Sequence, residues 1–482
     1  MTAEVSATSR LDPTRFPAGW RDLRVLFVTG RLAETLVRRT VTQAAADATF
    51  TAEVRVLGIS VAALMHAKWV QRKLVIEPDQ FDLVVLPGWC QGDIQPLAEQ
   101  LRCPVLLGPR EIQDLPEWLG RGKSPPPDLS SYDIEILAEI NHAPRLPTCE
   151  LLAIAQRYRS DGADVIDLGC IPGERWPGVD DAVRVLRAEG LRVSIDSFDR
   201  TEVEAAVAAG AELVLSCNAS NRDWAQHLPA ELVAIPDDPA QLETLDETVA
   251  MLQAAQARYR LDPILEPVGY GFAASLDRYS AICRRYPDQP RMMGIGNVTE
   301  LAQVDSAGLN FLLAAICQEH RIGSVLTTEV ANWCRSAVRE FDLARRLVRH
   351  AITQRTLVKR LPESLLLLRD ARVVCPDNET LELLAERITD PNVRLFVQGK
   401  HLHLLNRDGH WRGDDPFDVF ERFLRESSGV DAAHAFYLGY ELAKATTAMT
   451  LGKQYTQDQP LNWGPLTRPE QSRHADRKGA TD

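Results

Sequence analysis

The stretch ADVIDLGC (residues 163–170), together with LRVSIDSFD (residues 191–199) that follows it, is the clearest indication of the fold. Each stretch is an apolar run that ends on one aspartate, Asp167 in the first and Asp196 in the second. Continuous apolar runs of this length are typical of strands buried on both faces of a parallel sheet. A buried strand that ends on a carboxylate predicts that its carboxyl end meets water or a ligand.

The same alternation of a short apolar run and an amphipathic helix repeats eight times between residues 134 and 350. The helical runs, such as VDDAVRVLRAEG, carry apolar residues at three- and four-residue spacing. Eight βα units in a segment of this size predict a (β/α)₈ TIM barrel. The predicted strands are 134–140, 165–169, 192–196, 212–217, 231–236, 263–267, 292–297 and 324–329.

In such a barrel the carboxyl ends of the strands form the active-site mouth, and seven of the eight strands deliver a polar residue there. Carboxylates accept two hydrogen bonds from an N–C–N edge, and amides satisfy an adjacent carbonyl and ring nitrogen; a pterin offers that edge. Capping of the next helix is the competing explanation for any single residue, but it does not account for the whole set. The set is Asn141, Asp167, Asp196, Asn218, Glu266, Asn297 and Glu329.

Two smaller domains are expected to flank the barrel. Residues 21–122 alternate Val- and Leu-rich runs with helices, which predicts an open α/β domain of the Rossmann or flavodoxin-like kind. Residues 123–133 (KSPPPDLSSYD) read as a proline-rich linker. Residues 361–466 predict a small α+β domain, and residues 467–482 a disordered tail.

The α+β domain contains a hairpin signal and three histidines. The sequence NRDG at 406–409 lies between two alternating runs, which favours a tight turn. His401 and His403 are two residues apart on one strand face, and with His410 they could bind a metal; partly exposed polar residues without a ligand are the more common outcome.

Composition narrows the possible partners. The chain has 482 residues and a formal net charge of -13 without basic clusters, which disfavours nucleic acid. Its nine cysteines include no CxxC pair, which argues against a zinc ribbon or a disulfide scaffold. No apolar stretch is long enough to span a bilayer and no signal peptide is evident, so we expect a cytoplasmic protein without a membrane partner.

The strand-end motifs resemble those of a known family. EILAEINHAP, GADVIDLG, GERWPG, VSIDSFD, LSCNAS and LEPVGYGF are similar, in order and spacing, to the motifs of dihydropteroate synthases and of pterin-binding methyltransferases built on the same barrel. The resemblance implies a pterin site formed by Asp167, Asp196, Asn218 and Glu266. It also implies that Asn141 binds magnesium and the leaving pyrophosphate, and that Arg175 lies on a mobile loop.

Two motifs depart from the synthase pattern. Dihydropteroate synthases carry Ser-Arg-Lys after the seventh strand and Arg-x-His near the eighth, where this chain has Gly296-Asn297-Val298 and Thr327-Thr328-Glu329. The first of these looks like the motif of methyltetrahydrofolate methyltransferases, whose asparagine lies by the pterin N5. Asn297 is therefore a catalytic candidate for either chemistry.

The carboxyl-terminal run ELAKA…LGKQY resembles a dihydropteroate synthase-related group associated with tetrahydromethanopterin biosynthesis. The resemblance implies a one-carbon-pathway transferase that condenses 6-hydroxymethyl-7,8-dihydropterin diphosphate with an arylamine such as ribofuranosylaminobenzene phosphate. It further implies Mg2+ as cofactor and a homodimer. The alternatives are a pterin-dependent methyltransferase with a corrinoid partner, or a non-catalytic pterin-binding assembly protein.

Overall fold

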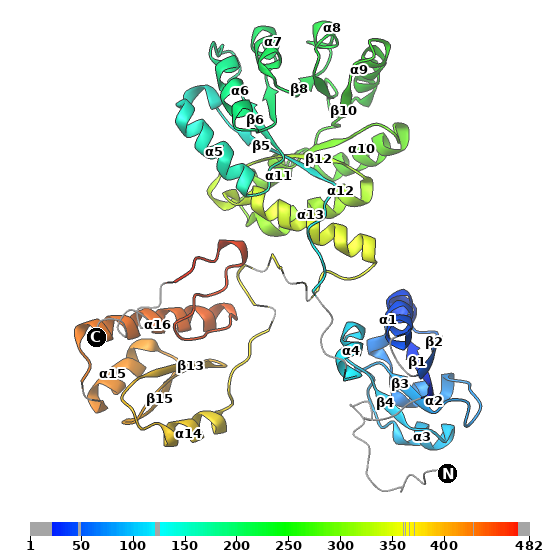
Figure 1. The fold of residues 1–482 in the computed structure, drawn as a ribbon, viewed down its shortest axis with the longest axis vertical. Helices are drawn as coiled ribbons and strands as arrows, with labels where there is room; N and C mark the ends of the chain where they lie inside the picture. Colours follow the sequence, from blue (N-terminus) through cyan, green and yellow to red (C-terminus); the bar gives the residue numbers. More distant parts are fainter. Residues whose placement is uncertain are drawn as a thin grey trace. The chain divides into compact units, whose positions relative to one another are not determined.

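The computed structural model describes residues 22–470 except 47–49, 121–125, 360, 362, 366, 371 and 428. Contacts divide the chain into two units, one of residues 1–130 with 350–362 and one of residues 131–349 with 363–482. The ribbon in Figure 1 shows the elements of each unit. The predicted tail lies mostly outside the described residues.

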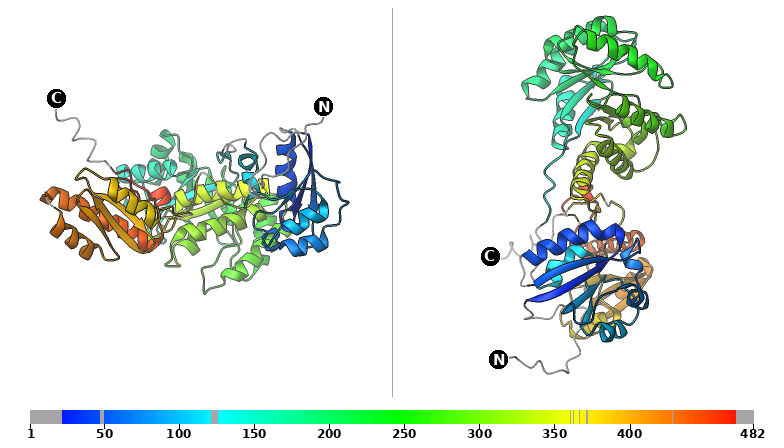
Figure 2. Two further views of the ribbon diagram at one scale, coloured as in Figure 1. Left: turned by 90° about the horizontal axis from the view of Figure 1, so that it is seen from below. Right: turned by 90° about the vertical axis from the view of Figure 1, so that its right-hand side faces the viewer.

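The first unit contains a four-stranded parallel sheet in the order β2-β1-β3-β4. Alternate side chains of β1 enter two separate cores, with Leu26 and Val28 in one and Val25 and Phe27 in the other. The sheet is thus covered on both faces, as Figure 2 shows. Its elements are β1 (Leu23–Thr29), η1 (Arg31–Ala33), α1 (Glu34–Ala46), β2 (Phe50–Val56), η2 (Ala62–Leu64), α2 (Ala67–Lys73), β3 (Leu83–Leu86), α3 (Gln95–Leu101), β4 (Val105–Leu107), η3 (Ile112–Asp114) and α4 (Leu115–Trp118).

Eight parallel strands of the second unit form a barrel, which confirms the predicted (β/α)₈ architecture. The sheet runs β10-β9-β8-β7-β6-β5-β12-β11, and a parallel bridge between Leu261 and Arg291 joins its two ends. Its strands are β5 (Glu135–Ile140), β6 (Val165–Gly169), β7 (Val193–Asp196), β8 (Leu213–Cys217), β9 (Glu231–Ala234), β10 (Tyr259–Leu261), β11 (Met292–Gly294) and β12 (Ser324–Thr328).

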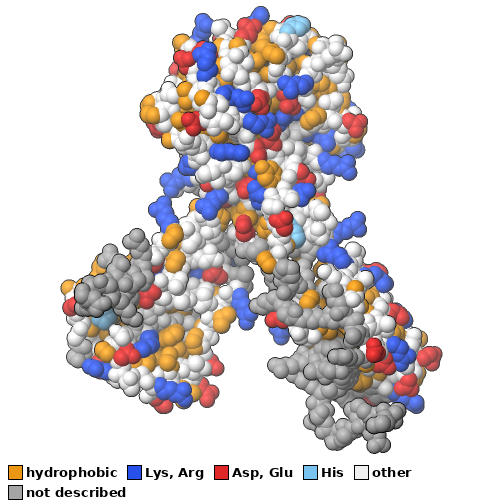
Figure 3. Space-filling view, in the orientation of Figure 1, with side chains coloured by type: hydrophobic (Ala, Val, Ile, Leu, Met, Phe, Trp, Pro, Cys, Tyr) orange, Lys and Arg blue, Asp and Glu red, His pale blue; other side chains and the backbone are white. Residues whose placement is uncertain are grey.

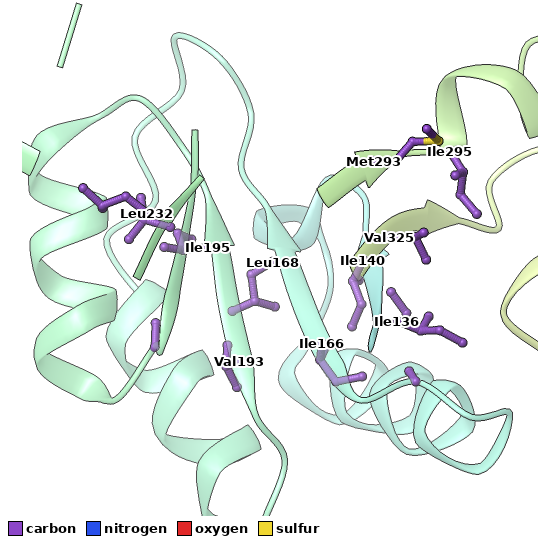
Figure 4. Packing of buried hydrophobic residues seen from close by; sticks show 14 of the residues in the cluster. Ile136, Ile140, Ile166, Leu168, Val193, Ile195, Leu232, Met293, Ile295 and Val325 are labelled. Carbon is purple, nitrogen blue, oxygen red and sulfur yellow. The ribbon is translucent and has the colours of Figure 1, made fainter. Parts of the chain in front are cut away.

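Helices surround these strands, and the main core lies between the two layers (Figure 4). The barrel helices are η4 (Ala143–Arg145), α5 (Thr148–Ser160), α6 (Val179–Ala188), α7 (Arg200–Ala209), α8 (Arg222–Ala225), α9 (Leu242–Ala254), α10 (Phe272–Arg285), α11 (Gly296–Thr299), α12 (Ser306–His320), η5 (Asn332–Cys334) and α13 (Ala337–Gln354).

Side chains alternate between the helices and the inside of the barrel. Ile166, Leu168, Val193 and Ile195 belong to the core shared with the helices. A separate, smaller cluster contains Leu137, Val165, Leu213, Leu215, Val233 and Met292, which are the alternate residues and fill the barrel interior. Because successive strand residues point to opposite faces, Glu139 and Asp167, two positions after Leu137 and Val165, also face inward.

The sixth barrel strand differs from the prediction. The strand predicted at 263–267 is wrong, because β10 is Tyr259–Leu261 and Asp262 follows it directly. Pro263 has no N–H to donate to a ladder, and Ile264 has φ +64, so the chain leaves the extended conformation there. Asp262, and not Glu266, therefore follows the end of this strand.

The remaining segment of the second unit contains an antiparallel sheet in the order β13-β14-β15. Asn406 and Gly409 pair at the end of the β14–β15 hairpin, and the Asn406 side chain accepts from the amides of Asp408 and Gly409. The expected turn at 406–409 is therefore present. The elements are α14 (Asn378–Arg387), β13 (Arg394–Gln398), β14 (His401–Asn406), β15 (Gly409–Gly413), α15 (Pro416–Glu426), α16 (Ala432–Leu451) and η6 (Gly464–Leu466).

The three histidines of this sheet do not gather into one site. His403 is buried, and its Nδ1 lies 2.9 Å from Nε2 of His410. The Nδ1 of His401 instead lies 3.2 Å from a guanidinium nitrogen of Arg412. Across the part of the chain that the structure describes, they form no group that could hold a metal.

The outer surface carries charges of both signs. Basic and acidic side chains are interspersed on the face drawn in Figure 3. Within the described ranges, no helix is both long enough and apolar enough to cross a bilayer.

Candidate functional site

Three carboxylates from adjacent strands meet inside the barrel near the carboxyl ends of β5, β6 and β7. They belong to Glu139, Asp167 and Asp196, and one oxygen from each lies within 4.8 Å of the other two. Glu139 and Asp167 are register partners on β5 and β6, and Asp196 pairs with Gly169 one layer nearer the strand ends. We call these three residues the carboxylate cluster.

Gly169 provides the space that lets Glu139 reach the cluster. A Cβ atom at Gly169 would lie 2.6 Å from Oε1 of Glu139 and 3.4 Å from Cα of Asn141. Any larger residue would therefore displace the Glu139 carboxylate. The glycine in VIDLG is thus a packing requirement of the cluster rather than a turn.

Asp167 lies at the bottom of the cluster. Its side chain is fully buried, and Oδ1 accepts a 2.5 Å hydrogen bond from the hydroxyl of Ser194 on β7. Its Oδ2 is buried without a hydrogen-bond partner. Burial, together with the charges on Asp196 and Glu139, raises the pKa of Asp167 well above its usual value. This oxygen is a buried acceptor to which the described residues direct no donor.

The other two carboxylates also lack basic partners. Burial, and then the charges on Asp196 and Glu300, raises the pKa of Glu139 to about 7. Burial raises the pKa of Asp196 to about 6. Among the described residues, no hydrogen bond or ion pair reaches either side chain. The cluster is therefore a concentrated acceptor site that a cation, or a ligand rich in N–H groups, would stabilise.

A fourth carboxylate at the mouth, Asp262, is already satisfied by the protein. Its Oδ1 accepts from the hydroxyl of Tyr279 at 2.6 Å and from the amide of Ile264 at 2.8 Å. Burial outweighs these two bonds and raises the pKa of Asp262 to about 6. Asp262 thus orders the β10–α10 connection.

Two further acidic residues form ion pairs. Glu266 accepts a 2.6 Å hydrogen bond from Arg278 on α10, and its Oε2 would lie 2.6 Å from a Cβ on Gly271. Glu329 is buried and accepts from Arg157 at 2.5 Å and from the amide of Val338 at 3.1 Å. Both carboxylates already have cationic partners, so they are less available to a ligand than the cluster is.

The predicted amide residues lie in loops and helix starts around the same end. The Oδ1 of Asn218 accepts from the amide and the hydroxyl of Ser220, a local arrangement typical of a turn. Asn297 is exposed in the first turn of α11, and its Nδ2 donates to the carbonyl of Leu265 at 2.9 Å. Asn141 is half-buried directly after β5.

The predicted arginine and two aromatic side chains lie on the loops. Arg175 is exposed in the loop between β6 and α6. Phe198, which follows β7, is 51% exposed, and Tyr270, which precedes α10, is 80% exposed. Aromatic rings left in water at a barrel mouth are available to cover the face of a planar ligand.

Of the predicted residues, the structure brings Asp167 and Asp196 together and places the backbone of Asn141 against Gly169, whereas Glu266 pairs with Arg278. Sequence reasoning missed Glu139 and Asp262. Glu139 lies within the predicted strand EILAEI, two residues after Leu137, and its inward position could have been found from that spacing. Asp262 was missed because PILEP was read as the strand.

Comparisons with known proteins match separate parts of the chain. Residues 23–110 match a family of unknown function, DUF6513, and residues 374–458 match the family described as PterinBD-DUF4346. An uncharacterized protein of Methanocaldococcus jannaschii is 25% identical over 526 residues, which cover 90% of this chain and 98% of that protein.

Several solved dihydropteroate synthases are similar to about half of the chain. The Yersinia pestis enzyme with a pterine-sulfa conjugate is 20% identical and covers 47% of this chain and 95% of its own, with a TM-score of 0.36. The Burkholderia cenocepacia enzyme complexed with 7,8-dihydropteroate is 21% identical and covers 46% of this chain and 93% of its own, with a TM-score of 0.35.

Proposed function

We propose that this protein is a pterin-utilising transferase that condenses 6-hydroxymethyl-7,8-dihydropterin diphosphate with an arylamine. The observation that carries the proposal is the carboxylate cluster, which offers several acceptors and receives no basic side chain from the described residues. A pterin presents an amide N–H and an exocyclic amino group along one edge. Such an edge donates paired hydrogen bonds to carboxylates.

The chain's own residues can orient this ring. Asp196 is nearest the strand ends and would accept from the N–C–N edge, with Asp167 below it as the second acceptor. Asn218 and Glu266 would contact the rim of the ring, and Phe198 would cover one face. Fixing the ring in this way holds its methylene carbon in one position for the attacking amine.

The diphosphate requires positive charge, and Asn141 offers a ligand for a hard cation. It lies half-buried directly after β5, and an amide oxygen suits Mg2+. When bound, magnesium would neutralise charge that develops on the leaving diphosphate. Arg175, exposed on the β6–α6 loop, would add a second positive charge.

Two sequence observations support the pterin assignment. The strand-end motifs resemble those of dihydropteroate synthases, and the family matched at residues 374–458 carries a pterin-binding name. The more specific substrate, ribofuranosylaminobenzene phosphate, and a place in tetrahydromethanopterin biosynthesis rest on the likeness of ELAKA…LGKQY to the related group.

Calorimetric titration with the pterin diphosphate, with and without Mg2+, followed by a pyrophosphate-release assay with candidate arylamines, tests the proposal. Asp196→Asn is expected to weaken pterin binding by roughly 10- to 100-fold, because a charge-assisted hydrogen-bond pair is lost. Asp181→Asn is the matched control, since the Asp181 side chain is 82% exposed on α6. Unchanged affinity in Asp196→Asn for every pterin tested would refute the pocket assignment.

Methyl transfer from a reduced pterin to a corrinoid partner is the second candidate, and one observation favours it. Asn297 is exposed at the start of α11, with its amide held by the carbonyl of Leu265. Such an amide could contact the ring nitrogen that carries the methyl group. Tight binding of a methylated pterin without any need for magnesium, and without pyrophosphate release, would select this reaction.

A further inference from the structure

We infer that Glu139, Asp167 and Asp196 form a binding site for one divalent cation of the Mg2+, Mn2+ or Ca2+ class. The inference concerns the ion alone and does not depend on the pterin reaction. It also differs from the sequence-based expectation, which placed magnesium at Asn141.

The ligand geometry is the first observation. One oxygen from each of the three carboxylates lies within 4.8 Å of the other two. Two oxygen ligands of one ion are at most about 5 Å apart for Ca2+ and about 4 Å apart for Mg2+. The three oxygens therefore already lie within the span of a Ca2+ coordination sphere, and small side-chain shifts would bring them to the span of Mg2+.

The unpartnered oxygen of Asp167 is the second, independent observation. The side chain is fully buried, and Ser194 occupies only Oδ1. Oδ2 has no hydrogen-bond partner. A buried polar atom without a partner is costly, and an ion within the cluster would supply that partner. Ser194 would then fix the orientation of the ligand from behind, as outer groups commonly do at metal sites.

Charge is the third observation. The described residues direct no Lys or Arg side chain to the cluster, whereas Glu266 and Glu329 at the same end of the barrel have Arg278 and Arg157. Three carboxylates without a counterion favour a doubly charged ion over a singly charged one. Three oxygen ligands from rigid strands leave the remaining positions of the ion to water or to a bound substrate.

The site and the proposed pterin pocket can coexist. Each carboxylate has about four lone pairs on two oxygens, so Asp196 can direct one oxygen to the ion and the other to the ring. Oδ2 of Asp167 can bind the ion, while a second lone pair of Oδ1, beside the bond from Ser194, remains for the ring.

Titration of the chelator-treated full chain with MnCl2 and MgCl2, in the absence of any pterin, tests the site directly. We expect one saturable site in the native protein. Glu139→Gln is expected to weaken it by at least about tenfold, since even outer-shell changes at metal sites cost 10- to 100-fold.

Two further variants separate geometry from charge. Gly169→Ala keeps all three carboxylates but places a Cβ 2.6 Å from Oε1 of Glu139, so it should weaken ion binding as Glu139→Gln does. Glu266→Gln removes one negative charge from the same end of the barrel but leaves the cluster intact, and it should bind the ion as the native chain does. Circular dichroism spectra of the variants would verify folding.

The outcomes are distinct. Absence of saturable binding by the folded native chain would overturn the inference, and so would equal affinity in Glu139→Gln or an equal loss in Glu266→Gln. The variant Asn141→Ala distinguishes this ion site from the proposed function. This variant should lose magnesium-dependent binding of the pterin diphosphate but should still bind the ion alone.

Discussion

The carboxylates on the two sides of the barrel mouth differ in whether the protein supplies them with partners. On the side of β10 and β12, Glu266 and Glu329 are paired with arginines, and Asp262 accepts two hydrogen bonds from the protein. On the side of β5, β6 and β7, three carboxylates crowd together without a cation. Protein partners offset part of the cost of burying the carboxylates of the first group, whereas the crowded carboxylates have no such partner and are available to a ligand. Stability measurements can test this contrast.

The crowded side should give the largest effect. The pKa of Glu139 is about 7 in the folded chain, above its usual value of 4.5. The folded state therefore favours the protonated side chain; this stabilisation is full below pH 4.5 and is lost as the pH rises through 7. Glu139→Gln cannot ionise. In the presence of a chelator, it should therefore be more stable than the native chain at pH 8, by at most about 3 kcal/mol.

Urea denaturation at pH 5 and pH 8 measures this difference. The gain should be small at pH 5, where the native carboxyl group is protonated in the folded chain, and full at pH 8. A variant less stable than the native chain at pH 8 without metal would show that the cluster is not repulsive.

The paired side should respond in the opposite direction. Arg157→Ala leaves the buried Glu329 carboxylate with one hydrogen bond, from the amide of Val338, and no counterion. We expect a loss of about 2 kcal/mol, below the cost of breaking a fully buried pair because Arg157 is 49% exposed. The double variant Arg157→Ala with Glu329→Gln should recover much of the loss. Urea midpoints of both variants provide the comparison, and no recovery would argue against an electrostatic cause.

A neutral donor should give the smallest effect. Tyr279→Phe removes the hydroxyl that donates to Asp262, while the amide of Ile264 still donates to the same carboxylate. The expected loss is about 1 kcal/mol at pH 8, where Asp262 is ionised in the fold. It should shrink near pH 5, because a protonated Asp262 depends less on this donor. A loss independent of pH would indicate that packing of the ring, rather than the hydrogen bond, is the cause.

Stretches with an unambiguous period could be predicted from the sequence. VIDLG and VSID are apolar except for the inward residues, and the structure places strands there. PILEP has the composition of a strand, but the proline and the positive φ at Ile264 end the strand before it. Local composition could not distinguish these cases, because a strand also needs backbone donors and an extended conformation at every position.

Strand and helix periods are local properties of the chain, so the barrel and the carboxylates at its mouth can be predicted from the amino-acid sequence. Which of these carboxylates receive protein partners depends on the three-dimensional packing. Arg157 on α5 is far in sequence from its partner Glu329, and Arg278 lies on α10, outside the loop that carries its partner Glu266. Both pairs follow from how these helices pack against the barrel. Glu139 joins Asp167 and Asp196 because three strands align in register and Gly169 has no side chain to block it. That distinction between occupied and available carboxylates depends on distances across the barrel, which no single stretch of sequence contains.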